Sequence, residues 1–128
     1  MSPLEQLGHE KYLSLTAFRR SGEAVATAVW AVRDDQVLLV TTDGASGKVK
    51  RIRHTERVTL TPCDMRGRVA DGASHTEARA TVITDPAVLD RLEGLIKTKY
   101  GLVGRLFALG GRLRRKGARV GLRITMTD

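Results

Sequence analysis

The stretch VLLVTTDGASGKVKRIR, residues 37–53, contains an apolar run, a glycine-containing loop and a basic segment, in that order. The apolar run predicts a buried strand that ends in Thr41 and Thr42, and the segment opening at Ser46 predicts a short helix. A strand that delivers a loop to a helix N-terminus forms an anion site, because unpaired N–H groups and the helix dipole attract negative charge there. We therefore predict that this stretch binds an anionic group.

The residue types of the predicted helix support this interpretation. Ser46 can cap the helix or donate its hydroxyl to a phosphate, and Gly47 lets the backbone approach a ligand closely. At about 100° per residue, Val49 and Ile52 share one face and are expected to pack inward. The basic residues flank that face, with Lys48 and Arg51 on one side and Lys50 and Arg53 on the other. The glycine spacing is not that of a P-loop, and the alternative interpretation is a solvated basic helix.

Composition limits the partners of this chain. The 128 residues predict one domain, residues 1–128, and 41% hydrophobic residues are enough for a real core. A net charge of +8 predicts an anionic partner, which leaves nucleic acid, a membrane surface and a phosphorylated cofactor as candidates. Aromatic residues make up only 4% of the chain, which is poor for stacking on nucleic acid bases.

Several other classes of protein are disfavoured. No apolar run approaches the roughly 18 residues of a membrane span, and the N-terminus lacks the pattern of a signal peptide. The single cysteine, Cys63, fits a reducing cytoplasm and is interpreted as a small buried residue. The histidines, His9, His54 and His75, are far apart in the sequence, so we expect no metal site.

Strand patterns dominate the rest of the chain. Residues 25–33 are largely apolar on both faces, which predicts a central strand. Without an alternating strand and helix rhythm, a parallel doubly wound sheet is disfavoured, and a small antiparallel barrel is favoured. The first three predicted strands would form an antiparallel meander. The six predicted strands are residues 12–19, 25–33, 36–42, 57–63, 74–84 and 119–127.

Two further helices are predicted from capping signals. Ser2 and Asp85 are each followed by a proline at the first helical position. Gly101 interrupts the second of these helices, and residues 102–115 form another helical stretch with a basic last turn. The apolar stripe before Gly101 consists of Val88, Leu89, Leu92, Leu95, Ile96 and Tyr100.

An ordered set of landmarks covers nearly the whole chain. They are LTAFRR at residues 15–20, VATAVW at 25–30, SGKVKRIR at 46–53, RVTLTPCD at 57–64, KYGL at 99–102 and VGL at 120–122. In this order they resemble the pyridoxamine 5'-phosphate oxidase-like split β-barrel proteins that bind FMN or coenzyme F420. Within this family it looks more like the small actinobacterial, mycobacterial-type members described as F420-dependent oxidoreductases. The resemblance implies a mainly β fold, a six-stranded antiparallel split β-barrel with short helices inserted between strands.

The same resemblance implies how a cofactor would lie. It implies a homodimer with two cofactor sites at the subunit interface, and it puts the cofactor phosphate against the turn at residues 46–48 and the basic residues nearby. The ribityl chain would lie near Thr41 and Thr42. The residues implied to bind the cofactor are Thr27, Ala28, Val29 and Trp30 along its ring, with Thr41, Thr42, Ser46, Gly47, Lys48, Lys50, Arg51 and Arg53 along its ribityl chain and phosphate.

The leading functional hypothesis is an F420-dependent oxidoreductase in the cytoplasm, which transfers a hydride from F420H2 to an unidentified small-molecule substrate. The cofactor carries the hydride chemistry in such enzymes, so no catalytic residue is assigned. The alternatives are an FMN-binding oxidase or reductase, a non-catalytic F420 carrier, and a nucleic-acid-binding module that uses residues 48–53 and 112–116. As proton donors, Tyr12, Tyr100, His54 and His75 are weak candidates because no acid–base pair is visible.

Overall fold

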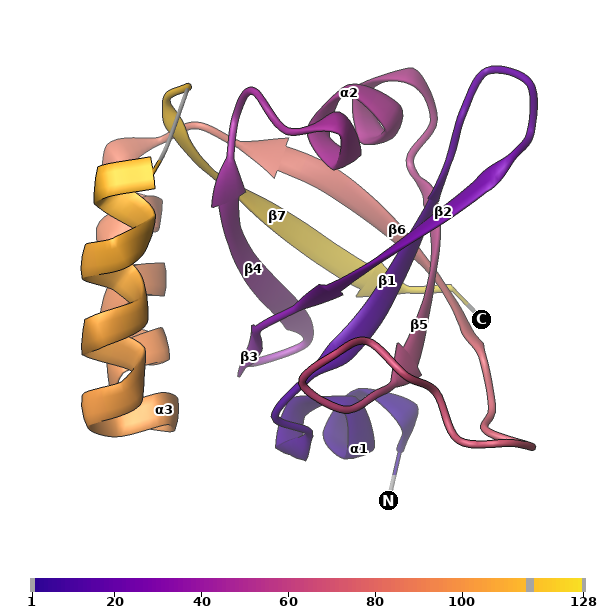
Figure 1. Ribbon diagram of the computed structural model, residues 1–128, viewed down its shortest axis with the longest axis horizontal. Helices are drawn as coiled ribbons and strands as arrows, with labels where there is room; N and C mark the ends of the chain where they lie inside the picture. The colour runs from indigo at the N-terminus through magenta and orange to yellow at the C-terminus, as the bar shows by residue number, and fades with distance from the viewer. Residues whose placement is uncertain (1, 115–116, 128) are drawn as a thin grey trace.

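The computed structural model describes residues 2–114 and 117–127, and it describes side chains at 2–103 and 117–127. Arg115 and Lys116, and the side chains of Arg112 and Arg114, are therefore outside the described residues. The described chain forms three helices and seven strands (Figure 1). The helices are α1 (Pro3–His9), α2 (Gly47–His54) and α3 (Pro86–Arg114). The strands are β1 (Leu13–Phe18), β2 (Ala24–Val29), β3 (Ala31–Asp34), β4 (Val37–Asp43), β5 (Arg57–Pro62), β6 (Thr76–Ile83) and β7 (Arg119–Met126).

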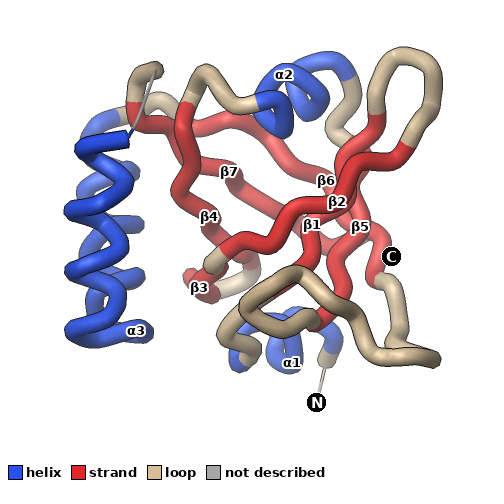
Figure 2. Tube along the Cα trace, in the orientation of Figure 1, coloured by secondary structure: helices blue, strands red, loops and turns tan. Residues whose placement is uncertain are grey.

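All seven strands belong to one antiparallel sheet in the order β2-β1-β5-β6-β7-β4-β3. The sheet curls strongly, and α1 and α2 lie at opposite ends of the curl (Figure 2). The predicted class, a mainly β split barrel with short helices between strands, is confirmed. The predicted count of six strands is too low by one.

The additional strand arises because residues 25–33 do not form one central strand. The chain leaves β2 at Trp30 and enters β3, and these two strands stand at opposite ends of the sheet order. The two antiparallel pairings of the predicted meander are confirmed, as β1 with β2 and β3 with β4, but its middle strand is divided, so the three strands do not lie side by side. Both faces of the segment are apolar for a different reason: Val29 packs in the interior of the curl, whereas Trp30 and Val32 pack in a second cluster.

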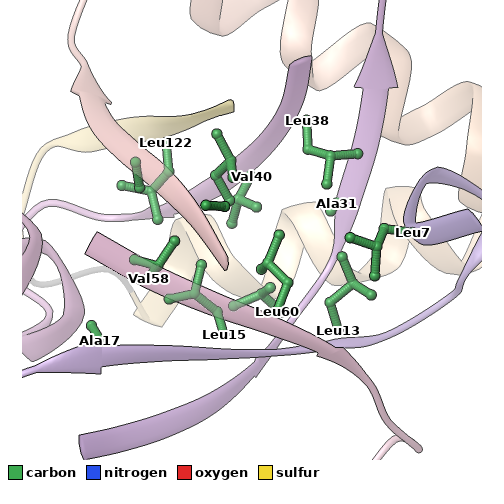
Figure 3. Close-up of a cluster of buried hydrophobic side chains, with 14 of the residues drawn as sticks. Leu7, Leu13, Leu15, Ala17, Ala31, Leu38, Val40, Val58, Leu60 and Leu122 are labelled. Atoms are coloured by element: carbon green, nitrogen blue, oxygen red, sulfur yellow. The ribbon is translucent and has the colours of Figure 1, made fainter. Parts of the chain in front are cut away.

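The main core fills the curl of the sheet. Alternation along the strands directs one face inward, as predicted for Leu13, Leu15 and Ala17 of β1. The helices close the two ends, with Leu4 and Leu7 from α1 and Ile52 from α2 (Figure 1). Figure 3 shows how the side chains from β1, β3, β4, β5 and β7 meet. The labelled residues are Leu7, Leu13, Leu15, Ala17, Ala31, Leu38, Val40, Val58, Leu60 and Leu122.

The second cluster lies between the sheet and α3. Its buried members are Trp30, Val32, Leu39, Leu89, Leu92 and Ile96. The predicted apolar stripe of α3 is thus confirmed at its buried positions. Gly101 has φ +61°, a backbone conformation that glycine adopts easily, and α3 reverses direction there (Figure 1). The predicted interruption at Gly101 is confirmed.

Lys99 and Tyr100 join α3 to the connection between β2 and β3. The Tyr100 ring stacks on Trp30 with centroids 4.1 Å apart, and the single proton of its hydroxyl is shared between the carbonyl oxygens of Lys11 (2.8 Å) and Ala31 (3.2 Å). Lys99 Nζ donates to the carbonyl oxygens of Glu10 (2.7 Å) and Ala31 (2.6 Å). Burial raises the pKa of Tyr100 to about 12, so its hydroxyl keeps its proton and remains a donor.

Removal of the Tyr100 hydroxyl tests this junction. We expect Tyr100→Phe to lower the free energy of unfolding by about 0.5–1.5 kcal/mol, because its hydrogen bonds are lost while the stacked ring remains. Urea unfolding followed by Trp30 fluorescence measures the change. Within the described residues the Tyr12 hydroxyl has no recorded hydrogen bond, so Tyr12→Phe is the matched control. An equal effect in the two variants would show that the Tyr100 hydroxyl does not stabilise the junction.

Candidate functional site

The end of β4, the loop after it and the first turn of α2 form the predicted anion site. The helix is fixed to the protein by Val49 and Ile52, which are each 1% exposed, so their predicted inward packing is confirmed. Ser46 is at the N-cap position, but its side chain makes no capping bond to the described helix. Instead its Oγ lies 3.5 Å from Thr42 Oγ1, within hydrogen-bond distance. The first turn of α2 therefore keeps N–H groups that Ser46 does not cap.

Lys48 points back toward this same turn. Its Nζ donates to Thr42 Oγ1 at 3.1 Å, and the residue is only partly exposed. Burial and the neighbouring charge of Arg51 lower the pKa of Lys48, while Asp43 opposes the shift. This partly buried ammonium differs from the freely solvated residue of the alternative interpretation, and it lies beside two hydroxyl groups.

Arg51 folds over the start of the helix. A Cβ atom added to Gly47 would lie 2.8 Å from Nη1 of Arg51, so glycine leaves the space that the guanidinium occupies. The Nε atom of Arg51 is buried and has no hydrogen-bond partner among the described residues. Buried donors are nearly always paired in proteins, and an acceptor such as a phosphate oxygen would satisfy this one.

The remaining two basic residues of α2 are not part of this group. Lys50 and Arg53 are exposed on the outer side of the helix. The structure therefore brings together Thr42, Ser46, Lys48 and Arg51 around Gly47, and Thr41 is exposed on the opposite side of β4 from Thr42.

The loop before α2 is held by contacts that the sequence analysis did not predict. Asp43 Oδ1 accepts hydrogen bonds from the backbone N–H groups of Ala45 and Gly117, both at 2.9 Å. The N–H of Gly44 donates to the carbonyl oxygen of Ala118 at 2.8 Å. The pair Asp43-Gly44 indicates a turn, but its partners Gly117 and Ala118 are far away along the chain, so residue patterns near the loop do not predict these contacts.

Residues 27–30, which the resemblance puts along the cofactor ring, do not share one environment. On β2, Thr27 and Val29 point toward the interior while Ala28 is exposed on the other face. Thr27 Oγ1 is buried and has no partner among the described residues, like Arg51 Nε. Trp30 is buried against Tyr100 in the second cluster. The assignment of these residues to a ring stays a prediction, and Trp30 has a clear role in packing.

The other candidate proton donors show no arrangement for acid–base catalysis among the described residues. The Tyr100 hydroxyl is used by backbone carbonyls, and His75 Nδ1 lies 2.6 Å from Thr61 Oγ1. His54 is exposed, and burial raises the pKa of the Cys63 thiol, with Asp64 and Glu10 adding to the shift. In the part of the chain that the structure describes, no group of three or more His, Cys, Asp or Glu residues could hold a metal ion.

A surface pocket at the other end of α2 is a second place where cations gather. Its lining includes His54, Arg57 and Arg79 together with two acidic residues. Arg57 forms an ion pair with Glu77 at 2.9 Å, and Arg79 lies 3.7 Å from Glu56. Because these arginines already have carboxylate partners, this pocket is a weaker anion site than the start of α2.

Ser46 gives a direct test of the site's construction. Because its side chain makes no capping bond, Ser46→Ala should change the free energy of unfolding by less than about 0.5 kcal/mol. Ser2 is the matched control, since its Oγ accepts from the Glu5 N–H at 3.2 Å. Ser2→Ala should cost about 1 kcal/mol in the same urea titration. A loss at Ser46 as large as that at Ser2 would contradict the geometry.

Comparisons with known proteins bear on the fold. The model of the family described as pyridoxamine 5'-phosphate oxidase matches residues 4–128. A conserved hypothetical protein of Mycobacterium tuberculosis, Rv2991, has 23% identity and a TM-score of 0.73, and the match covers 100% of this chain and 82% of that one. A protein named F420 reductase has 22% identity and a TM-score of 0.61, with 100% and 96% covered.

The heme storage protein HutZ of Vibrio cholerae has 11% identity and a TM-score of 0.71, with 98% of this chain and 88% of HutZ covered. The comparison with curated proteins gave no match. Within the described residues, no helix is both long enough and apolar enough to cross a membrane. At these identities the structural likenesses establish the fold alone.

Proposed function

The chain belongs to the pyridoxamine 5'-phosphate oxidase family, and we propose that it binds a flavin-type cofactor through its phosphate at the start of α2. The observation that carries the proposal is the group of Thr42, Ser46, Lys48 and Arg51 around the first turn of the helix. Cations, hydroxyls and free N–H groups at a helix N-terminus are the donors that a phosphate needs. The buried Nε of Arg51, which has no hydrogen-bond partner among the described residues, supports the fit.

The proposed roles of the residues follow from their positions. Gly47 leaves room for the Arg51 guanidinium beside the first turn of α2, and Lys48 and Arg51 neutralise the charge of the phosphate. Thr42 would lie toward the ribityl chain, and the β2 residues Thr27, Ala28 and Val29 would lie along the ring. Thr41 is on the other side of β4, so its assignment to the ribityl chain rests on the resemblance alone. When bound, the cofactor supplies hydride transfer, and the protein holds and orients it and excludes water. Trp30 stacks on Tyr100 and would support this side of the ring site.

For the identity of the cofactor, we propose coenzyme F420 and an F420-dependent oxidoreductase of the mycobacterial type that acts on a small molecule. The name of the F420 reductase supports this choice, and so does the net charge of +8. F420 has a polyglutamate tail and is more anionic than FMN. The exposed Lys50 and Arg53 could meet such a tail. FMN is the alternative cofactor, and a non-catalytic carrier is the alternative function, because the heme storage protein HutZ has a similar fold.

We further propose that the protein is a homodimer, with one domain spanning residues 1–128 of each subunit, in the cytoplasm. The strand β2 stands at one end of the sheet and exposes Ala24, Ala26 and Ala28 on its outer face. A second subunit could cover this face and complete the wall of the ring site. Sedimentation that shows only monomer at micromolar concentration, with cofactor bound, would contradict the dimer.

Parallel titration of the purified protein with F420 and FMN tests the proposed function. We expect F420 to bind at least about tenfold more tightly, a difference of about 1.4 kcal/mol. Equal affinities, or FMN that co-purifies with the protein, would favour the FMN alternative. Binding of neither cofactor, together with tight binding of nucleic acid, would contradict the proposal. Oxidation of F420H2 with added substrates then separates an enzyme from a carrier.

A further inference from the structure

Asp43, the last residue of β4, connects two parts of the chain that are distant in sequence. One oxygen of its carboxylate, Oδ1, accepts from the N–H of Ala45 and from the N–H of Gly117, each at 2.9 Å. Its own carbonyl oxygen accepts from the N–H of Ser46 at 3.0 Å. Hydrogen bonds to a carboxylate are stronger than those to a neutral acceptor. Asp43 therefore fixes both the turn before α2 and the segment that leads into β7.

The two segments pack too closely for larger residues. A Cβ atom on Gly117 would lie 2.8 Å from the backbone nitrogen of Ala45 and 2.9 Å from Asp43 Oδ1. One on Gly44 would lie 2.9 Å from the carbonyl oxygen of Ala118, which already accepts from the Gly44 N–H. The path of the loop is thus set by its contacts with residues 117–118.

The carboxylate of Asp43 has two opposite effects on an anion bound at α2. Its negative charge repels the anion. The same charge raises the pKa of Lys48, which opposes the lowering by burial and by Arg51. Its hydrogen bonds hold the loop that presents Ser46 and Gly47. If charge alone mattered, an anion site would be better without this carboxylate. The two effects can be separated by substitution.

We propose that Asp43 is a positioning residue for the phosphate site, and that it acts by holding the β4–α2 loop against residues 117–118. This inference rests on the proposed function, because a phosphate at the start of α2 is the ligand that the loop would present. The segment after α3 is then part of the construction of the site, although it contributes only backbone atoms of Gly117 and Ala118.

The test uses FMN and riboflavin, which share the ring and ribityl chain and differ by the phosphate. The ratio of their dissociation constants measures the contribution of the phosphate in each variant. Asp43→Asn keeps an oxygen that accepts both N–H groups, so the ratio should stay within about threefold of wild type or favour FMN more. Asp43→Ala removes the acceptor, so the preference for FMN should fall at least about tenfold despite the loss of a negative charge.

Hydrogen exchange at the Ala45 and Gly117 amides gives a second readout. Both amides should be protected in wild type and in Asp43→Asn, and both should exchange faster in Asp43→Ala. If Asp43→Ala does not fold, Gly44→Ala displaces the same loop from Ala118 and should lower the preference for FMN in the same way.

The outcomes distinguish this inference from the proposed function. Suppose that wild type prefers FMN and that Asp43→Ala and Gly44→Ala keep or increase that preference. Asp43 then only repels anions, and the inference is overturned while the phosphate site remains. If Asp43→Asn loses the preference as completely as Asp43→Ala, the carboxylate acts by its charge and the positioning role is overturned. If wild type itself binds FMN and riboflavin equally, the phosphate site is absent and both proposals are overturned.

Discussion

Replacement of Lys48 by alanine is expected to weaken the binding of F420, or of FMN, by about 10- to 150-fold, which corresponds to one charge-assisted hydrogen bond of about 1.5–3 kcal/mol. Lys48 Nζ lies 3.1 Å from Thr42 Oγ1, in the first turn of α2, where the helix dipole also attracts a phosphate. Without cofactor, the free energy of unfolding should change by less than about 1 kcal/mol, because burial of this ammonium carries its own cost. Titration and urea unfolding measure the two quantities separately.

Lys50 is the matched control for this prediction. It is on the same helix with the same charge, but its side chain is exposed and outside the group around Gly47. Lys50→Ala should weaken binding by less than about threefold. If Lys48→Ala binds both cofactors as tightly as wild type does, α2 is a solvated basic helix and the site has been assigned to the wrong surface.

A core substitution is expected to have the second large effect. Leu122 is 0% exposed in the middle of β7, with Val82 and Val40 opposite it on the two neighbouring strands. Leu122→Ala should lower the free energy of unfolding by about 2–5 kcal/mol, since it removes buried methyl groups and leaves a cavity. Such a loss is a large part of the total stability of a small protein.

Urea unfolding followed by circular dichroism measures this loss. Met65→Ala removes a side chain that is 70% exposed, and it should change the free energy by less than about 0.5 kcal/mol. Similar effects of the two substitutions would show that the interior of the curled sheet is not the main source of stability.

Local patterns in the sequence predicted much of the fold because strand alternation, helical spacing and helix capping depend only on neighbouring residues. Alternation predicted the inward face of β1, helical spacing predicted the burial of Val49 and Ile52, and Ser2 formed the expected cap. The break in α3 followed from Gly101 alone. Each of these features depends on residues within a few positions of one another.

The division of residues 25–33 could not be predicted in this way. A segment that is apolar on both faces fits a central strand, but it also fits a chain that passes from one core to another at Trp30. Only the strand order distinguishes these possibilities, and strand order depends on pairing across the whole chain.

The predicted site shows the same division between local and distant contacts. The sequence predicted an anion site at the start of α2, and the gathering of Lys48, Ser46 and Thr42 there is a local arrangement. The bond between Asp43 and Gly117 spans 74 positions and has no local signal. The fold of Arg51 over Gly47 depends on a side-chain conformation that residue spacing does not specify.

A nuclear magnetic resonance titration of the wild-type protein with F420 observes the backbone amides and so locates the bound phosphate. A phosphate at the start of α2 predicts that the largest shifts occur at residues 44–48, with further shifts at residues 27–29 from the ring. Largest shifts at the pocket lined by His54, Arg57 and Arg79, with residues 44–48 unchanged, would contradict it.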